Sequence, residues 1–140
     1  MKILILNGPN LNLLGKREPN IYGAKSFEAF LEEVKKEFSN HEIDYYQSNV
    51  EGEIIDTLQK YEQQNFSGII INAGGYSHTS VAIADAVASI SIPVISVHIS
   101  NIYRRESERH KELIAQYVQG GIFGLGINGY RLAIQHLASL

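Results

Sequence analysis

The chain has 140 residues, of which 44% are hydrophobic and 19% are charged. We expect residues 1–140 to form a single globular domain. Twelve Lys and Arg against fifteen Asp and Glu give a formal net charge of −3, which argues against a general nucleic-acid binder and against a polybasic membrane-surface protein. The absence of cysteine excludes disulfides, thiolate metal sites and cysteine nucleophiles.

The first apolar run, residues 3–6, is short and is followed by Asn7-Gly8-Pro9. It is too short for a signal peptide or a membrane span, so it predicts a buried strand and a cytoplasmic protein. An irregular stretch rich in Gly and Pro then runs from about residue 7 to residue 23. Loops this long inside a compact domain are commonly functional, and we expect an active-site lid at about residues 15–24.

The next elements alternate between helical and strand patterns. Ser26 is expected to cap a helix, because apolar residues recur behind it at helical spacing as far as Phe38. A strand is predicted at residues 42–47, a helix at 54–61, and a buried strand at 68–72.

The remaining elements repeat this alternation. An Ala-rich helix is predicted at residues 79–90 and a third buried strand at 93–99. A helix with a thin apolar face is predicted at 106–117, a last strand at 121–126 and a last helix at 128–137. Strands and helices that alternate about five times predict an α/β fold, a flavodoxin-like doubly wound five-stranded parallel sheet of order 2-1-3-4-5.

Ligands of open parallel sheets bind beyond the carboxyl ends of the strands. The polar residues predicted at this edge are Asn7, Asn10 and Asn12 after the first strand, Asn72, Tyr76, Ser77 and His78 after the third, and His98, Ser100, Asn101, Arg104, Arg105 and Arg109 after the fourth. Taken singly, an Asn here is commonly a turn former and a buried His is commonly satisfied by backbone groups. Their convergence on one edge is what predicts a site.

Familiar motifs do not account for this edge. Residues 124–129 match G-x-G-x-x-G, but too little chain follows for a dinucleotide site, so we interpret these glycines as close helix–strand packing. No P-loop motif is present, and no carboxylate accompanies His78 and His98 at a metal-ligand spacing. None of the seven lysines is predicted to be buried for Schiff-base chemistry.

Cofactor-free acid–base chemistry remains. Tyr22 becomes a usable base if a nearby guanidinium favours its phenolate, and Arg17 lies on the same loop. His98 can donate a proton near neutral pH. A base, an acid and neutral amides suit an elimination through an enolate.

Several strings of the sequence, in order along the whole chain, resemble the type II 3-dehydroquinate dehydratases. They are NGPNLNLLG at residues 7–15, REP at 17–19, IYG at 21–23, QSN at 47–49, NAGGYSHTS at 72–80, VHISN at 97–101 and GLG at 124–126. The resemblance implies a flavodoxin-like lyase that dehydrates 3-dehydroquinate to 3-dehydroshikimate. That reaction belongs to the shikimate pathway, which leads to chorismate and the aromatic amino acids.

The resemblance also implies residue roles, without any metal or cofactor. Tyr22 would remove a proton from carbon 2, activated by Arg17 on a mobile lid, and Asn12 would hold a water against the enolate oxygen. His98 would protonate the hydroxyl that leaves carbon 1. The substrate-binding residues implied are Asn72, His78, Arg109 and the backbone of Ile99 and Ser100, with Asp85 reaching a neighbouring subunit. The family forms trimers that combine into dodecamers, so a homo-oligomer is expected.

The sequence departs from the family pattern near His98, both at position 96 and in the stretch after Asn101, where it has Tyr103, Ser107 and Glu108. Where the family usually has glutamate two residues before the catalytic histidine, this chain has Ser96. Residues 96 and 98 point to the same side of a strand, and serine brings no charge to orient His98. The alternative hypothesis is therefore a non-catalytic ligand-binding homologue that has lost the acid step.

Overall fold

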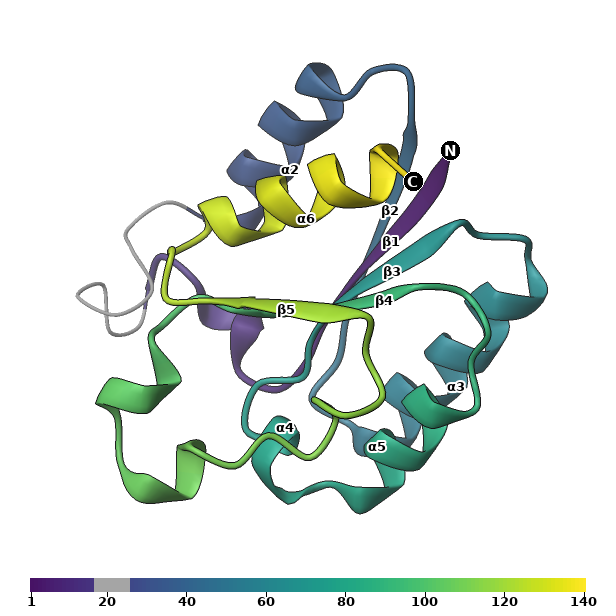
Figure 1. Cartoon of the computed structure of the whole chain (residues 1–140). Helices are drawn as coiled ribbons and strands as arrows, with labels where there is room; N and C mark the ends of the chain where they lie inside the picture. Colours follow the sequence, from purple (N-terminus) through teal and green to yellow (C-terminus); the bar gives the residue numbers. More distant parts are fainter. Residues whose placement is uncertain (17–25) are drawn as a thin grey trace.

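The computed structural model describes residues 1–16 and 26–140, and its strands form one parallel sheet (Figure 1). The strand order is β2-β1-β3-β4-β5, so the predicted flavodoxin-like order is confirmed. The strands are β1 (Lys2–Asn7), β2 (Glu42–Gln47), β3 (Gly68–Asn72), β4 (Val94–His98) and β5 (Gly120–Phe123).

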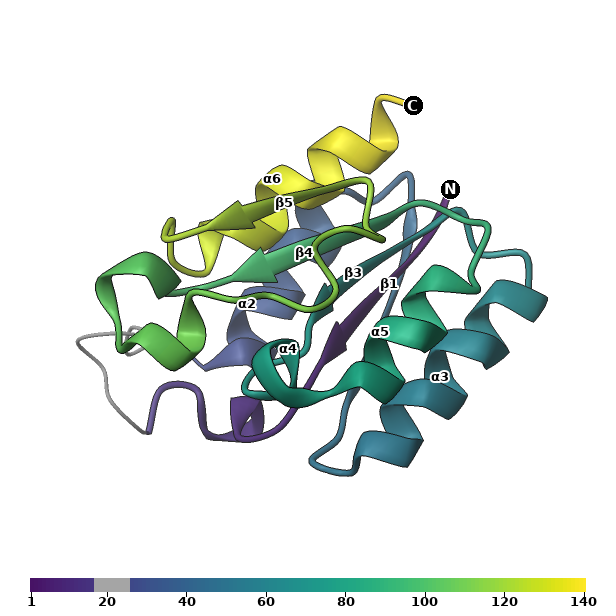
Figure 2. The same cartoon turned by 60° about the horizontal axis from the view of Figure 1, so that its bottom comes forward.

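Helices cover both faces of this sheet (Figures 1 and 2). Helices α2 (Phe27–Glu37) and α6 (Asn128–Ala138) lie over one face, and α3 (Glu51–Gln63) and α5 (Val81–Ala88) lie over the other. The short α4 (Tyr76–Thr79) follows β3 and leads into α5. No helix in residues 1–16 and 26–140 is long and apolar enough to cross a membrane.

The interior strand β1 explains why two separate cores form. Successive side chains of a strand point to opposite faces, and Ile3 and Ile5 pack under α2 and α6 whereas Leu4 and Leu6 pack under α3 and α5. All four side chains are fully buried. This two-sided burial is the reason that the first strand reads as a continuous apolar run rather than an alternating one.

The start of α2 follows the predicted capping pattern. The Ser26 hydroxyl accepts a hydrogen bond from the Ala29 backbone N–H at 3.2 Å, which satisfies one of the free donors of the first turn. The helix predicted at 79–90 is interrupted at Ser80, whose extended backbone separates α4 from α5. The strand predicted at 121–126 ends earlier, at Phe123, because Gly124 takes a left-handed conformation.

The prediction of a helix at residues 106–117 is wrong. The chain instead forms two 3-10 turns, η2 (Ile102–Arg104) and η3 (Ser107–Arg109), followed by irregular turns as far as β5. Only Ile114 in the predicted range is a fully buried apolar residue. A single anchor of this kind does not supply the recurring apolar stripe from which a surface helix gains its stability.

The sheet changes winding direction between β1 and β3, where the chain must pass very close to itself. The Gly8 N–H donates to the Asn72 carbonyl at 2.7 Å, just beyond β1. A Cβ at Gly8 would lie 2.5 Å from the Ala73 carbonyl oxygen, so only glycine fits. This contact lies at the switch point of the sheet, the place at which flavodoxin-like folds bind their ligands.

Candidate active site

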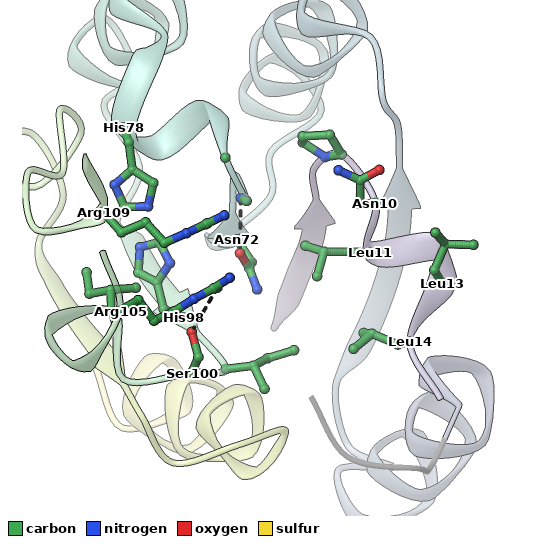
Figure 3. Close-up of a pocket in the computed structure, with 15 residues that line it drawn as sticks. Asn10, Leu11, Leu13, Leu14, Asn72, His78, His98, Ser100, Arg105 and Arg109 are labelled. Atoms are coloured by element: carbon green, nitrogen blue, oxygen red, sulfur yellow. Dashed lines mark hydrogen bonds between the residues drawn. The ribbon is translucent and has the colours of Figure 1, made fainter. Parts of the chain in front are cut away.

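A pocket lies at this switch point, beyond the carboxyl ends of β1, β3 and β4 (Figure 3). It encloses about 690 Å³, including the open space at its mouth. The loop after β1 forms one wall, and the segments after β3 and β4 form the other. Its lining residues are Pro9, Asn10, Leu11, Leu13, Leu14, Asn72, Gly74, Gly75, His78, His98, Ile99, Ser100, Ile102, Arg105 and Arg109.

His98 is the last residue of β4 and is only 6% exposed. Its ring stacks on the ring of His78, with centroids 5.8 Å apart and planes tilted by 25°. Ile99 and Ser100 follow directly in the wall of the pocket. The end of one strand therefore supplies a titratable ring and two backbone groups to the same cavity.

His78 is held in one tautomer. Its Nδ1 lies 2.8 Å from the Lys111 carbonyl oxygen, so Nδ1 carries a proton and donates it. Burial lowers the pKa of His78, the carbonyl contact opposes this, and the neighbouring His98 and Arg109 lower it further. A neutral ring with its proton on Nδ1 presents Nε2 as a hydrogen-bond acceptor, which suits a substrate hydroxyl.

Asn72 rests on a buried polar network beneath the pocket floor. Its Nδ2 donates to the Tyr130 hydroxyl at 2.8 Å, and that hydroxyl donates to Asn7 Oδ1 at 2.8 Å. Asn72 Oδ1 accepts from the Gly74 N–H at 3.1 Å. Asn7 and Asn72 pair across β1 and β3, so the network fixes the amide of Asn72 at the switch point.

Two arginines give the pocket a positive wall. Arg105 Nη1 donates to Ser100 Oγ at 3.4 Å, and Arg109 Nε donates to the Glu106 carboxylate. Both guanidinium groups reach the pocket from the irregular segment after β4. Positive charge here favours a ligand that carries a carboxylate.

Glu112 is a charged group that the sequence did not reveal. Its Oε1 lies 3.1 Å from His98 Nε2, an ion-pair distance, although the N–H bond is not aligned for a hydrogen bond. The Ser96 hydroxyl donates to the same oxygen. Burial opposes ionisation of this carboxyl, but the contact with His98 and the Ser96 hydrogen bond outweigh it, and the pKa of Glu112 is lowered.

The structure brings together six of the residues that were assigned a catalytic or substrate-binding role from the sequence. The predicted residues that line the pocket are Asn72, His78, His98, Ile99, Ser100 and Arg109. Asn12 and Asp85 are exposed and are not among the lining residues. Arg17, Tyr22 and most of the expected lid lie outside the described residues.

The pocket also contains Asn10, which was not assigned a role. It adopts a left-handed backbone with φ of 69° at the turn after β1, a conformation that Asn tolerates better than most residues. Its side chain lies on the wall formed by the loop after β1, on the side opposite His78 and His98 (Figure 3). The Gly8-Pro9-Asn10 turn signal was visible in the sequence, but a turn signal alone does not show which Asn faces inward.

The described residues bear on the metal alternative and on the glycines of the G-x-G-x-x-G match. Within residues 1–16 and 26–140, no group of three or more His, Cys, Asp or Glu is placed to hold a metal ion. A Cβ at Gly129, the last glycine of the G-x-G-x-x-G match, would lie 3.3 Å from Val97 and 3.4 Å from Ile122. Gly129 therefore allows α6 to pack closely on β4 and β5, as the sequence interpretation expected.

Comparisons with known proteins agree with this geometry. Residues 1–138 match the family model described as dehydroquinase class II. The chain is 51% identical to a 3-dehydroquinate dehydratase of Campylobacter jejuni, over 100% of this chain and 89% of that protein. It is 52% identical to one of Clostridium beijerinckii, over 98% and 95%.

Solved structures give the same result. The crystal structure of a type II dehydroquinase from Butyrivibrio crossotus superposes with a TM-score of 0.95 at 47% identity, covering 99% of this chain and 97% of that one. That of Propionibacterium acnes superposes with a TM-score of 0.93 at 39% identity, with the same coverage.

Proposed function

The chain belongs to the class II dehydroquinase family, and from this premise we propose which of its residues dehydrate 3-dehydroquinate to 3-dehydroshikimate. The enzyme is a hydro-lyase of the shikimate pathway. The observation that carries the residue assignment is the pocket at the switch point. Six residues that were assigned a role from the sequence, on three separate segments, line this one cavity.

The substrate is an anion with several hydroxyl groups, and the described wall fits those features. The guanidinium groups of Arg105 and Arg109 attract the carboxylate, and the backbone of Ile99 and Ser100 receives it. Nε2 of neutral His78 accepts a hydrogen bond from one substrate hydroxyl, and the fixed amide of Asn72 binds a second hydroxyl.

Elimination then needs a base and an acid. Tyr22, activated by Arg17, removes the proton from carbon 2, and the electrons move to the carbon 3 oxygen as an enolate. When the enolate collapses, the bond between carbon 1 and its oxygen breaks. His98 gives its proton to that oxygen, water leaves, and a double bond forms between carbons 1 and 2.

The water that faces the enolate oxygen requires an amide inside the pocket. Asn12, assigned this role by resemblance, does not line the cavity, whereas Asn10 does. We therefore place the role on Asn10. Asn10→Ala should lower kcat strongly, and the matched variant Asn12→Ala should leave it nearly unchanged. Equal losses in the two variants would reject this placement.

The activity is tested directly in the ultraviolet. Mixing the purified chain with 3-dehydroquinate should produce the absorbance of the conjugated enone, and Tyr22→Phe should abolish it while the far-UV circular dichroism is unchanged. Borohydride added with the substrate should trap no lysine adduct. An unchanged rate in Tyr22→Phe would remove Tyr22 as the base, and a trapped adduct would contradict the enolate route.

The non-catalytic alternative has no support in the comparisons. Its basis was the missing carboxylate at position 96, and Glu112 places a carboxylate beside His98 from another segment. Binding of 3-dehydroquinate without any enone absorbance would support the non-catalytic alternative.

The wider assembly also belongs to this proposal. We propose that residues 1–140 act as one domain with a lid at about residues 15–24, in a cytoplasmic homododecamer. Asp85 is exposed on α5, as a residue that serves a neighbouring subunit must be. Equilibrium sedimentation of the purified chain tests the subunit number.

A further inference from the structure

We propose that Glu112 is the positioning residue of the general acid His98, and that Ser96 holds Glu112 in that position. The proposal rests on the proposed dehydratase function and deepens it. In this chain, the negative charge that orients His98 comes from an irregular segment after η3. It does not come from β4, the strand that carries the histidine.

Glu112 and His98 form a close and largely buried pair. Oε1 of Glu112 lies 3.1 Å from Nε2 of His98, and the two side chains are only 13% and 7% exposed. Water screens a pair of charges little at such burial. Glu112 does not line the pocket, so it meets the substrate only through His98 and has no direct part in binding.

Ser96 fixes which carboxylate oxygen faces the ring. Residues 96 and 98 lie on the same side of β4, and Ser96 is 2% exposed. Its hydroxyl donates to the same Oε1 that contacts His98. A serine at this position therefore leaves space for a carboxylate from outside the strand and supplies the hydrogen bond that holds it.

The backbone around Glu112 is fixed on both sides. The preceding carbonyl, that of Lys111, accepts from His78 Nδ1 at 2.8 Å, and the following N–H, that of Leu113, donates to the Ser77 carbonyl at 2.8 Å. Ile114 is fully buried one residue later. The carboxylate is thus held by a rigid connection to α4, although no regular helix carries it.

This arrangement defines the proton path. The Glu112 carboxylate lies at an ion-pair distance from Nε2, so in the protonated ring the N–H at Nε2 faces this charge, and we assign the proton given to the leaving hydroxyl to Nδ1. The other charged or titratable groups that face this ring are His78, Arg105 and Arg109. Because two of these are permanent cations, Glu112 is the negative charge that stabilises the protonated ring among the described residues.

The first test removes the charge and keeps the shape. Glu112→Gln should lower kcat by about 10- to 100-fold, the range found when an outer partner that orients a histidine is lost. KM should change less than about threefold, because ground-state binding is untouched. The alkaline limb of the kcat profile should move to lower pH, since the protonated ring loses its stabilising charge. Glu108→Gln, on exposed η3, is the matched control and should change neither quantity.

The second test moves the carboxylate. The double variant Ser96→Glu with Glu112→Ser returns the charge to the strand, and it should recover most of the lost kcat and the original alkaline limb. A merely structural role of Glu112 predicts no recovery. The recovery also keeps the proposal testable if Glu112→Gln folds poorly, which thermal unfolding would reveal.

A third measurement separates this inference from the proposed function. The ring signals of His98, followed by NMR against pH, should titrate at lower pH in Glu112→Gln than in the unaltered chain, whether or not the chain turns over 3-dehydroquinate. An unaltered chain without turnover would reject the proposed function alone. An unchanged kcat profile and an unchanged ring titration in Glu112→Gln would overturn the role of Glu112.

Discussion

Replacing Tyr130 with phenylalanine removes one oxygen from the network beneath the pocket and leaves the ring in place. Tyr130 is fully buried, and its ring packs against those of Phe27 and Phe30 with centroids 5.0 and 6.0 Å away. The hydroxyl donates one hydrogen bond and accepts another, both at 2.8 Å. The substitution therefore strands two buried amide groups, Oδ1 of Asn7 and Nδ2 of Asn72.

The size of the loss follows from those two groups. Each buried polar group left without a partner costs about 1–3 kcal/mol, so Tyr130→Phe should lower the free energy of unfolding by about 3 kcal/mol. With an m-value of about 2 kcal/mol per molar urea, the midpoint should fall by about 1.5 M. The m-value itself should stay the same, because the ring remains buried.

Urea unfolding at one fixed protein concentration measures this loss, since assembly would make the midpoint depend on concentration. Tyr117→Phe, which removes the hydroxyl of a half-exposed ring, is the control. KM for 3-dehydroquinate should rise in Tyr130→Phe, because Asn72 is no longer held. A loss below about 0.5 kcal/mol, the level of an ordinary surface substitution, would refute the claim that this hydroxyl organises the switch point.

Three further substitutions test other parts of the fold. Gly8→Ala should cost about 2–3 kcal/mol and most of the activity, because its Cβ would meet the Ala73 carbonyl at 2.5 Å; Gly52→Ala, with nothing within 4 Å, should be neutral or stabilising in the same urea assay, and equal losses would contradict this. Ser26→Ala should lower the stability by about 1 kcal/mol without altering kcat, since it removes only the cap of α2; an unchanged midpoint would show that the cap contributes nothing. The lowered pKa of His78 means that the unfolded chain binds a proton which the folded chain refuses, so its contribution to stability is present above about pH 6.5 and is lost as the pH falls; urea midpoints at pH 5.5 and 7.5 should differ less in His78→Asn than in the unaltered chain, and an equal difference would argue against this reading.

Local patterns were sufficient for most of the fold. Local patterns predict the buried strands β1, β3 and β4 from their apolar runs, and the helix after Ser26 from its apolar stripe. These patterns can be recognised without knowing which segments pack against them. Their alternation implied the strand order, because a short chain of this kind has few other ways to cover both faces of a parallel sheet. The helix prediction for residues 106–117 was wrong because contacts with α4 and His98 decide the conformation of this segment. Its own apolar face is too thin to stabilise a helix.

The sequence by itself determined the topology, the edge of the sheet that carries the site, and the family. Those properties rest on patterns that are contiguous along the chain, including the strings around Asn72 and His98. Only the tertiary structure decided that Asn10 lines the pocket while Asn12 does not, that Tyr130 supports Asn72, and that Glu112 meets His98. Each of these is a contact between distant segments or a choice between neighbouring side chains. Such choices depend on where the backbone turns in space, which residue spacing does not specify.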